Sequence, residues 1–169
     1  MQMNNENKFK DLITENHALI MKVCIMFQND TAGRDDLFQD ICINIWKGLS
    51  NFQGRSSIST WLYKIALNTA LSQKRKDRRE PLDQALEIRD IPTDNPRDVS
   101  DRVNALYAGI DQLNVAEKAI ILLYLEEKSY EEIAEIIGIS KGNVSVKLVR
   151  IKRKLENEIR SYLIKRGQK

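Results

Sequence analysis

The chain of 169 residues is 42% hydrophobic and 30% charged, with a formal net charge of +3, which suits one globular domain or two small ones. It has no N-terminal signal segment and no apolar run of about 18 residues, so we expect a cytoplasmic protein without membrane insertion. Cys24 and Cys42 fall among apolar residues at helical spacing, so we expect buried thiols rather than a disulfide. They and the single histidine, His17, lack the spacing of ligands, so we expect no metal site and no cofactor.

Two amphipathic helices are expected at the N-terminal end. Apolar residues recur at helical spacing between residues 6 and 28, which predicts one long helix there. After a break at residues 29–33, a second helix is expected from about Arg34 to Gly48, with an inner face of Leu37, Phe38, Ile41, Cys42, Ile45 and Leu49. Its outer face sets the apolar Ile43 among polar residues, namely Asp36, Gln39, Asp40, Asn44 and Lys47. A solitary exposed apolar residue needs no explanation, but an acidic rim can also meet a basic partner protein.

The segment SNFQGRSS at residues 50–57 is a polar loop with one aromatic residue and one arginine. Phe52 could stack on a base of single-stranded nucleic acid while Asn51, Gln53 and Arg55 supply hydrogen bonds and charge. Alternatively, Phe52 anchors the loop on its own domain.

A third helix is expected to be capped by Ser59 and to face inward with Trp61, Leu62, Ile65, Ala66 and Thr69. Its end carries Lys74, Arg75, Lys76, Arg78 and Arg79. These cations suit a phosphate backbone as well as the dipole of a helix C-terminus.

An extended linker is predicted at residues 80–101, where three prolines occur without any helical period. Residues 1–79 carry 12 basic and 8 acidic side chains, the linker carries 2 and 7, and residues 102–169 carry 13 and 9. Two mildly basic ends around an acidic middle indicate two modules that face nucleic acid. The expected domains are therefore residues 1–79 and 102–169.

Four further helices are expected in the C-terminal domain, and no strand alternation occurs, so the predicted class is all-α. The first carries Val103, Leu106, Tyr107, Ile110 and Leu113, and Asn114 with Glu117 caps the second. Two short helices then flank a turn at Gly138, with a capping box of Ser129 and Glu132 before the first and Ser140 capping the second.

The last of these helices has an apolar inner stripe of Val144, Leu148, Ile151 and Leu155. Its opposite face carries Val146, Val149, Arg150 and Arg153, flanked by polar and basic residues without an acid. A helix-turn-helix places such a helix in the DNA major groove. The alternative interpretation of the pattern is a solvated helical hairpin within a larger bundle.

Three stretches together resemble the bacterial sigma-70 family in its two-domain extracytoplasmic-function (ECF) type. They are DLFQDICINIW at 36–46, LSNFQGRSSISTWLYKIALNTA at 49–70 and SYEEIAEIIGISKGNVSVKLVRIKRKL at 129–155. The linker leaves no room for a third domain, which favours the ECF type. The resemblance implies a non-enzymatic sigma factor that binds core RNA polymerase and promoter DNA, reads two promoter elements, helps to melt the DNA and commonly has an anti-sigma factor.

The resemblance also implies roles for particular residues. Those implied to bind the polymerase are Asp36, Gln39, Asp40 and Ile43. Those implied to bind the minus-ten element and its melted strand are Asn51, Phe52, Gln53, Arg55, Ser56, Lys64 and Asn68. Those implied to read the upstream, minus-thirty-five element are Lys141, Asn143, Ser145, Val146, Lys147, Val149 and Arg150. The competing functional interpretation is a stand-alone helix-turn-helix repressor or activator whose N-terminal helices dimerise or sense a ligand.

Overall fold

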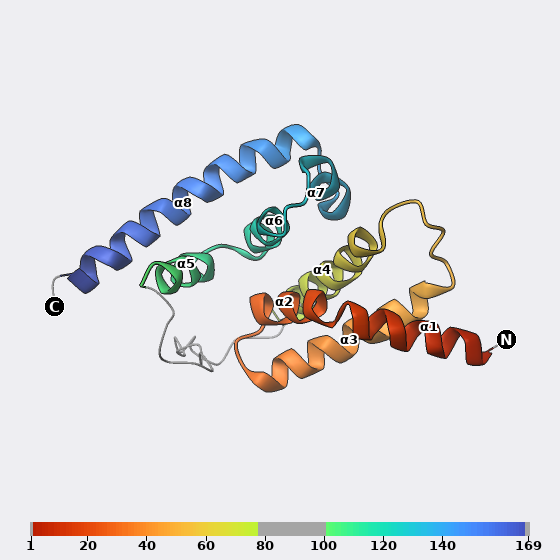
Figure 1. Ribbon diagram of the computed structural model, residues 1–169. Helices are drawn as coiled ribbons and strands as arrows, with labels where there is room; N and C mark the ends of the chain where they lie inside the picture. The colour runs from red at the N-terminus through yellow and green to blue at the C-terminus, as the bar shows by residue number, and fades with distance from the viewer. Residues whose placement is uncertain (1, 78–100, 168–169) are drawn as a thin grey trace. The chain divides into compact units, whose positions relative to one another are not determined.

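The computed structural model describes residues 2–77 and 101–167, which form eight α-helices and no strand (Figure 1). The predicted all-α class is therefore confirmed. The chain divides into two compact units, Met1–Arg89 and Asp90–Lys169. The predicted linker, apart from Asp101, lies outside the described residues, as do Arg78 and Arg79. None of the described helices combines the length and the apolar character that crossing a membrane requires.

The first unit contains α1 (Gln2–Glu15), α2 (His17–Phe27), α3 (Thr31–Leu49) and α4 (Ile58–Asp77). Helices α2, α3 and α4 pack against one another and enclose the core, whereas α1 makes fewer contacts, with α2 and α3. The largest core side chains are Ile20, Leu37, Ile41, Ile45, Leu62, Tyr63 and Leu67. Cys24 is buried and Cys42 is half-buried, and both are free thiols. Burial raises the pKa of Cys24 to about 11, so this thiol stays protonated.

The single helix predicted between residues 6 and 28 is wrong, because the chain breaks at Asn16 into α1 and α2. Asn16 leaves the helical conformation, with φ −112° and ψ 15°. Its backbone N–H and its side-chain amide both donate to the carbonyl of Leu12, at 3.2 and 2.9 Å. An asparagine side chain competes in this way with the helical ladder. The apolar period continues across a one-residue break, which is why the pattern alone conceals it.

The starts of α3 and α4 also differ from the prediction. Asp30 caps α3 by accepting a hydrogen bond from the Gly33 N–H at 2.8 Å, so the helix starts at Thr31 rather than near Arg34. Helix α4 is capped by Ser57 and not by Ser59, because the Ser57 hydroxyl accepts from the Thr60 N–H at 3.2 Å. Several serines in succession offer the same hydroxyl, and only the backbone geometry decides between them.

The second unit contains α5 (Asp101–Asp111), α6 (Val115–Leu125), α7 (Tyr130–Ile137) and α8 (Lys141–Gly167). The predicted caps before α6 and α7 are confirmed as complete capping boxes. Helix α8, however, has 27 residues and is not short. Helix α5 packs along α8, and a Cβ atom at Gly109 would come within 3.2 Å of Cδ2 of Leu155. Gly109 therefore allows the two helices to approach closely.

Candidate nucleic-acid interface

The turn between α7 and α8 is built by local hydrogen bonds that fix where α8 begins. Gly138 has φ 78°, a left-handed conformation that glycine adopts without strain, and its N–H donates to the Ala134 carbonyl at 2.9 Å. Two residues later, the Ser140 hydroxyl accepts from the Asn143 N–H at 3.2 Å. The turn and the cap predicted from the sequence are thus both confirmed.

Helix α8 presents two opposite stripes with the same spacing. The inner stripe, Val144, Leu148, Ile151 and Leu155, is buried as predicted. What we call the outer stripe, Gly142, Val146, Val149 and Arg153, is offset from it by two residues and is exposed. At about 100° per residue, an offset of two residues turns a side chain to nearly the opposite side of the helix. The exposed fractions are 52% for Val146 and 58% for Val149.

All seven residues that were assigned to the upstream element are exposed: Lys141, Asn143, Ser145, Val146, Lys147, Val149 and Arg150. They lie within the first three turns of α8 and so share one region of the surface. Because they are exposed, these side chains are accessible to a partner.

Some of the cations on and beside this face are already engaged. Lys141 pairs with Glu131 of α7, and the hydrogen bond lowers the pKa of that carboxyl. Lys152 donates to the Tyr124 hydroxyl at 2.8 Å, with its ammonium 4.0 Å from the ring centroid, and this hydrogen bond raises the pKa of Lys152. Among the described residues, three cations on this face form neither an ion pair nor a side-chain hydrogen bond: Lys147, Arg150 and Arg153.

Glu117 was predicted only as a capping residue, but it also fixes α8. Its carboxylate accepts from the Asn114 N–H at 3.1 Å and from the Lys154 ammonium at 2.6 Å. Burial raises the pKa of Glu117, but the two hydrogen bonds and the nearby lysine charges outweigh burial and lower it overall. The partners lie 37 residues apart in sequence, so no local pattern reveals this link between α6 and α8.

The loop at residues 50–57 is tied to its own unit. The Phe52 ring lies on Trp61 of α4, with 4.9 Å between the ring centroids and 44° between their planes. The Asn51 N–H donates to the Gly48 carbonyl at 3.0 Å. These contacts favour the interpretation of Phe52 as a loop anchor. The remaining loop residues assigned to the minus-ten element are exposed, or half-buried in the case of Ser56: Asn51, Gln53, Arg55 and Ser56.

The exposed face of α4 continues from this loop. Lys64 and Asn68, both assigned to the minus-ten element, are exposed and one turn apart. Ser72 and Arg75 extend the same row and are also exposed. Ser72 was not among the residues assigned from the sequence, although its spacing of four residues from Asn68 places it on the same row.

The residues assigned to polymerase binding share the outer face of α3. Asp36, Gln39, Asp40 and Ile43 are all exposed, and 49% of Ile43 is accessible. Asp40 is held in place by Gln73 of α4, whose side-chain amide donates to it at 2.7 Å.

Trp46 was missed in the sequence. It lies three residues beyond Ile43, is 45% exposed and packs edge-on against Phe9 of α1, with the ring centroids 5.2 Å apart. The outer face of α3 therefore has two neighbouring apolar side chains, not one.

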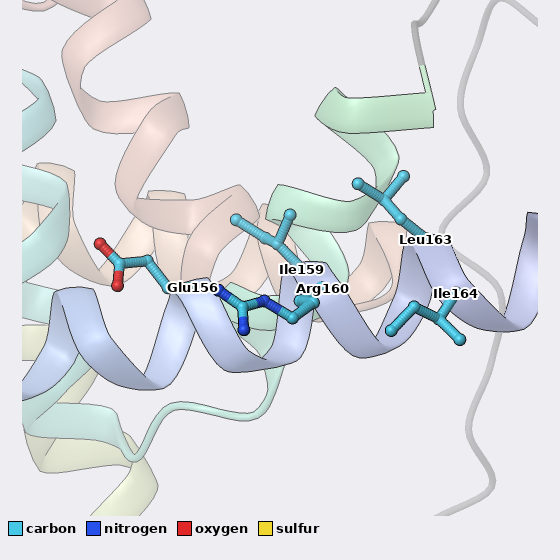
Figure 2. Close-up of a pocket in the computed structure, with 5 residues that line it drawn as sticks. All are labelled: Glu156, Ile159, Arg160, Leu163 and Ile164. Atoms are coloured by element: carbon cyan, nitrogen blue, oxygen red, sulfur yellow. The ribbon is translucent and has the colours of Figure 1, made fainter.

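A shallow hollow lies elsewhere on the second unit, along the later turns of α8 (Figure 2). It is lined by Glu156, Ile159, Arg160, Leu163 and Ile164. Ile159 and Leu163 lie on the same side of the helix (Figure 2), and three of the five lining residues are apolar. The described residues contain no group of three or more histidine, cysteine, aspartate or glutamate side chains that could hold a metal ion.

Comparison with known families gives two matches that together span most of the chain. The family model of Sigma-70 region 2 matches residues 12–80. The model of Sigma-70, region 4 matches residues 104–155. The two matches fall in different units, in the order in which the regions are numbered.

Individual relatives are similar over most of their length. The ECF RNA polymerase sigma-E factor of Haemophilus influenzae is 32% identical over 142 residues, which cover 76% of this chain and 75% of that protein. The RNA polymerase sigma-H factor of Pseudomonas aeruginosa is 25% identical over 177 residues, which cover 96% of this chain and 92% of that protein. Among solved structures, the sigma factor RpoE in complex with the anti-sigma factor NepR from Bartonella quintana has a TM-score of 0.70 at 23% identity and covers 90% of this chain and 97% of that chain. CnrH in complex with the cytosolic domain of CnrY has a TM-score of 0.62 at 18% identity and covers 92% of this chain and 90% of that chain.

Proposed function

The chain belongs to the sigma-70 family as an ECF sigma factor that directs RNA polymerase to promoters, and we propose how its surfaces divide this task. Members of this family are not enzymes, and they act together with core RNA polymerase and promoter DNA. A stand-alone repressor would not require an N-terminal unit of the region 2 type. We assign residues 1–79 to the polymerase and the minus-ten element, residues 80–101 to a linker and residues 102–169 to the upstream element, in the cytoplasm where the polymerase acts.

The first turns of α8 read the upstream element in the major groove. The observation that carries this assignment is an exposed helical face on which Lys147 and Arg150 form no ion pair within the described residues. Cations in this position hold phosphates or the edge of guanine, while Asn143 and Ser145 offer hydrogen bonds to neighbouring groups. Lys141 contributes less, because Glu131 already neutralises it.

The loop at residues 50–57 and the adjoining face of α4 bind the melted minus-ten strand. Phe52 supports this role as an anchor on Trp61, so that Asn51 and Gln53 present their amides in a fixed place. Ser56 and Arg55 add a hydroxyl and a charge beside them. Lys64 and Asn68 extend this polar surface along α4, where they can contact the phosphates of the strand.

The outer face of α3 binds core RNA polymerase. Asp36, Gln39 and Asp40 surround Ile43 with polar groups, and this pattern of an apolar centre within a polar rim is typical of protein interfaces. Trp46 adds a second partly exposed apolar side chain to the centre.

An anti-sigma factor is a further expected partner. The support comes from two similar solved structures: one holds the sigma factor RpoE with the anti-sigma factor NepR, and the other holds CnrH with the cytosolic domain of CnrY. Capture of one defined protein by the full chain, in competition with core polymerase, would support this expectation, and a lack of any competing partner would remove it.

Run-off transcription with purified core polymerase on a promoter library tests the assignment of α8. We expect Lys147→Ala with Arg150→Ala to reduce initiation at least tenfold on promoters that require the upstream element, since one base contact contributes about 1–3 kcal/mol. Arg160→Ala with Lys165→Ala removes the same charge from exposed positions farther along α8 and serves as the matched control. Equal activity of the two double variants would contradict the assignment.

A further inference from the structure

The outer stripe of α8 begins with three residues that the fold does not require. Glycine and valine are poor helix formers compared with alanine, lysine or arginine. Nevertheless, Gly142, Val146 and Val149 follow one another on the most exposed side of the helix. A Cβ atom at Gly142 would meet nothing within 4 Å, so no close packing within the chain explains this glycine. A contact outside the chain would account for all three residues.

The surroundings of the stripe favour DNA over a protein as that contact. Asn143, Lys147 and Arg150 border the stripe on one side and Ser145 borders it on the other, and all four are exposed. A narrow apolar strip between hydrogen-bonding and cationic groups matches the major groove, where phosphates flank the base edges. The apolar group on those base edges is the C5-methyl group of thymine.

On the basis of the proposed role of α8, we infer that Val146 and Val149 contact thymine methyl groups and that the upstream element carries thymine at two neighbouring positions, on either strand. The two valines lie three residues apart, which is about 4.5 Å along a helix. Successive base pairs are about 3.4 Å apart, so the valines reach adjacent or nearly adjacent steps. Gly142 lacks a side chain and lets the helix start approach the groove closely.

Methyl deletion on the DNA tests this inference directly. Initiation by the complete polymerase with the full chain is first measured on a promoter library, where we expect thymine to be enriched at two neighbouring upstream positions. Each of these thymines is then replaced by deoxyuridine, which removes the methyl group and leaves the hydrogen-bonding groups unchanged. Because burial of one methyl group contributes about 0.8 kcal/mol, we expect each replacement to reduce promoter binding about fourfold.

Valine variants assign the effect to particular side chains. Val146→Ala and Val149→Ala should each lose sensitivity to one of the two methyl groups, so that thymine and deoxyuridine templates bind alike at that position. Both valines are more than half exposed, so these substitutions leave the core intact. Val103→Ala is the matched control, because Val103 is also exposed, at 40%, but lies on α5. This control should keep the full fourfold sensitivity.

The outcomes separate this inference from the proposed function. If Lys147→Ala with Arg150→Ala impairs initiation but deoxyuridine has no effect on the native chain, α8 reads the element and the methyl contacts are refuted. If Val146→Ala and Val149→Ala weaken initiation equally on both kinds of template, the stripe binds a protein and the inference is also refuted. If Lys147→Ala with Arg150→Ala has no effect at all, the proposed role of α8 and the inference that rests on it are both refuted.

Discussion

The candidate surfaces of the two units differ in how strongly their side chains are bonded within the chain. In the first unit, Gln73 holds Asp40 at 2.7 Å and Trp61 supports Phe52. In the second unit, Val146 and Lys147 project from a regular helix, and Lys147 forms no ion pair with any described residue. Truncation of these bonded side chains in the first unit should therefore alter fold and function together, whereas truncation of Val146 or Lys147 on α8 should alter function alone.

The largest expected effect is on polymerase binding. Asp40→Lys with Ile43→Glu should weaken association with core polymerase about 30-fold, as expected for the centre of an interface, and should also lower stability slightly by releasing Gln73. Asp11→Lys with Ile25→Glu makes the same changes at exposed positions of the same unit, and Ile25 has the same 49% exposure as Ile43. Fluorescence titration measures the affinities, and similar values for both double variants would refute the assigned surface.

The next largest effect concerns promoter melting. Unstacking a base costs a few kcal/mol, which a protein must recover through contacts with the released base. Asn51→Ala with Gln53→Ala should therefore impair open-complex formation about tenfold on duplex promoters and much less on templates that are already mismatched across the minus-ten region. Permanganate footprinting of exposed thymines on the two templates provides the measurement. Equal losses on both would mean that these residues act in folding or in polymerase binding.

A double-mutant cycle tests the anchoring of the loop. An aromatic pair contributes about 0.5–1.5 kcal/mol beyond burial, so Phe52→Ala and Trp61→Ala should be coupled by a free energy in that range. Urea unfolding of the full chain and its three variants gives the value. Additive effects would show that the contact with Trp61 does not anchor Phe52.

Gly142→Ala should separate stability from function on α8. Alanine in a helix is favoured over glycine by about 0.5–1 kcal/mol, and the open space at this position lets the variant gain that stability. Initiation from promoters that need the upstream element should nevertheless fall a few-fold, because the added methyl group keeps the helix from approaching the groove. Thermal melting and run-off transcription measure the two effects, and a change in the same direction for both would contradict the expectation.

The smallest effect is on acid stability. The folded chain lowers the pKa of Glu117 below its usual 4.5, so its charge stabilises the fold above that pH and this contribution is lost as the pH falls through the lowered value. Glu117→Gln keeps an amide that can cap α6 but removes the charge that binds Lys154. Melting temperatures should therefore differ between variant and native chain at neutral pH and converge in acid. A constant difference at every pH would exclude this charge as the cause.

Local signals made much of the second unit predictable. A capping box needs only two residues three positions apart, and the boxes at Asn114 and Ser129 were found for that reason. Gly138 and the inner stripe of α8 depend on equally short-range rules. The all-α class followed from the same helical periods.

Contacts between residues that are far apart in sequence could not be predicted from such short-range patterns. The Phe52 ring lies on Trp61 because the loop folds back onto α4, and Lys154 meets Glu117 only after α6 and α8 have packed. Trp46 received no assignment from the sequence, and its contact with Phe9 of α1, 37 residues away, and its 45% exposure are visible only in the structure. The break at Asn16 depends on a side-chain hydrogen bond that an apolar period does not encode.

The close approach of α5 at Gly109 makes α8 a lever arm. The pivot is the contact of Gly109 with Leu155. Val144 lies 11 residues nearer the start of the helix, about 16 Å away along the axis. A tilt of about 10° at this pivot would therefore move the start of α8 by about 3 Å, which is nearly the 3.4 Å that separates successive base pairs. A larger side chain at position 109, remote from any DNA contact, would thus shift the register in which the helix meets its promoter.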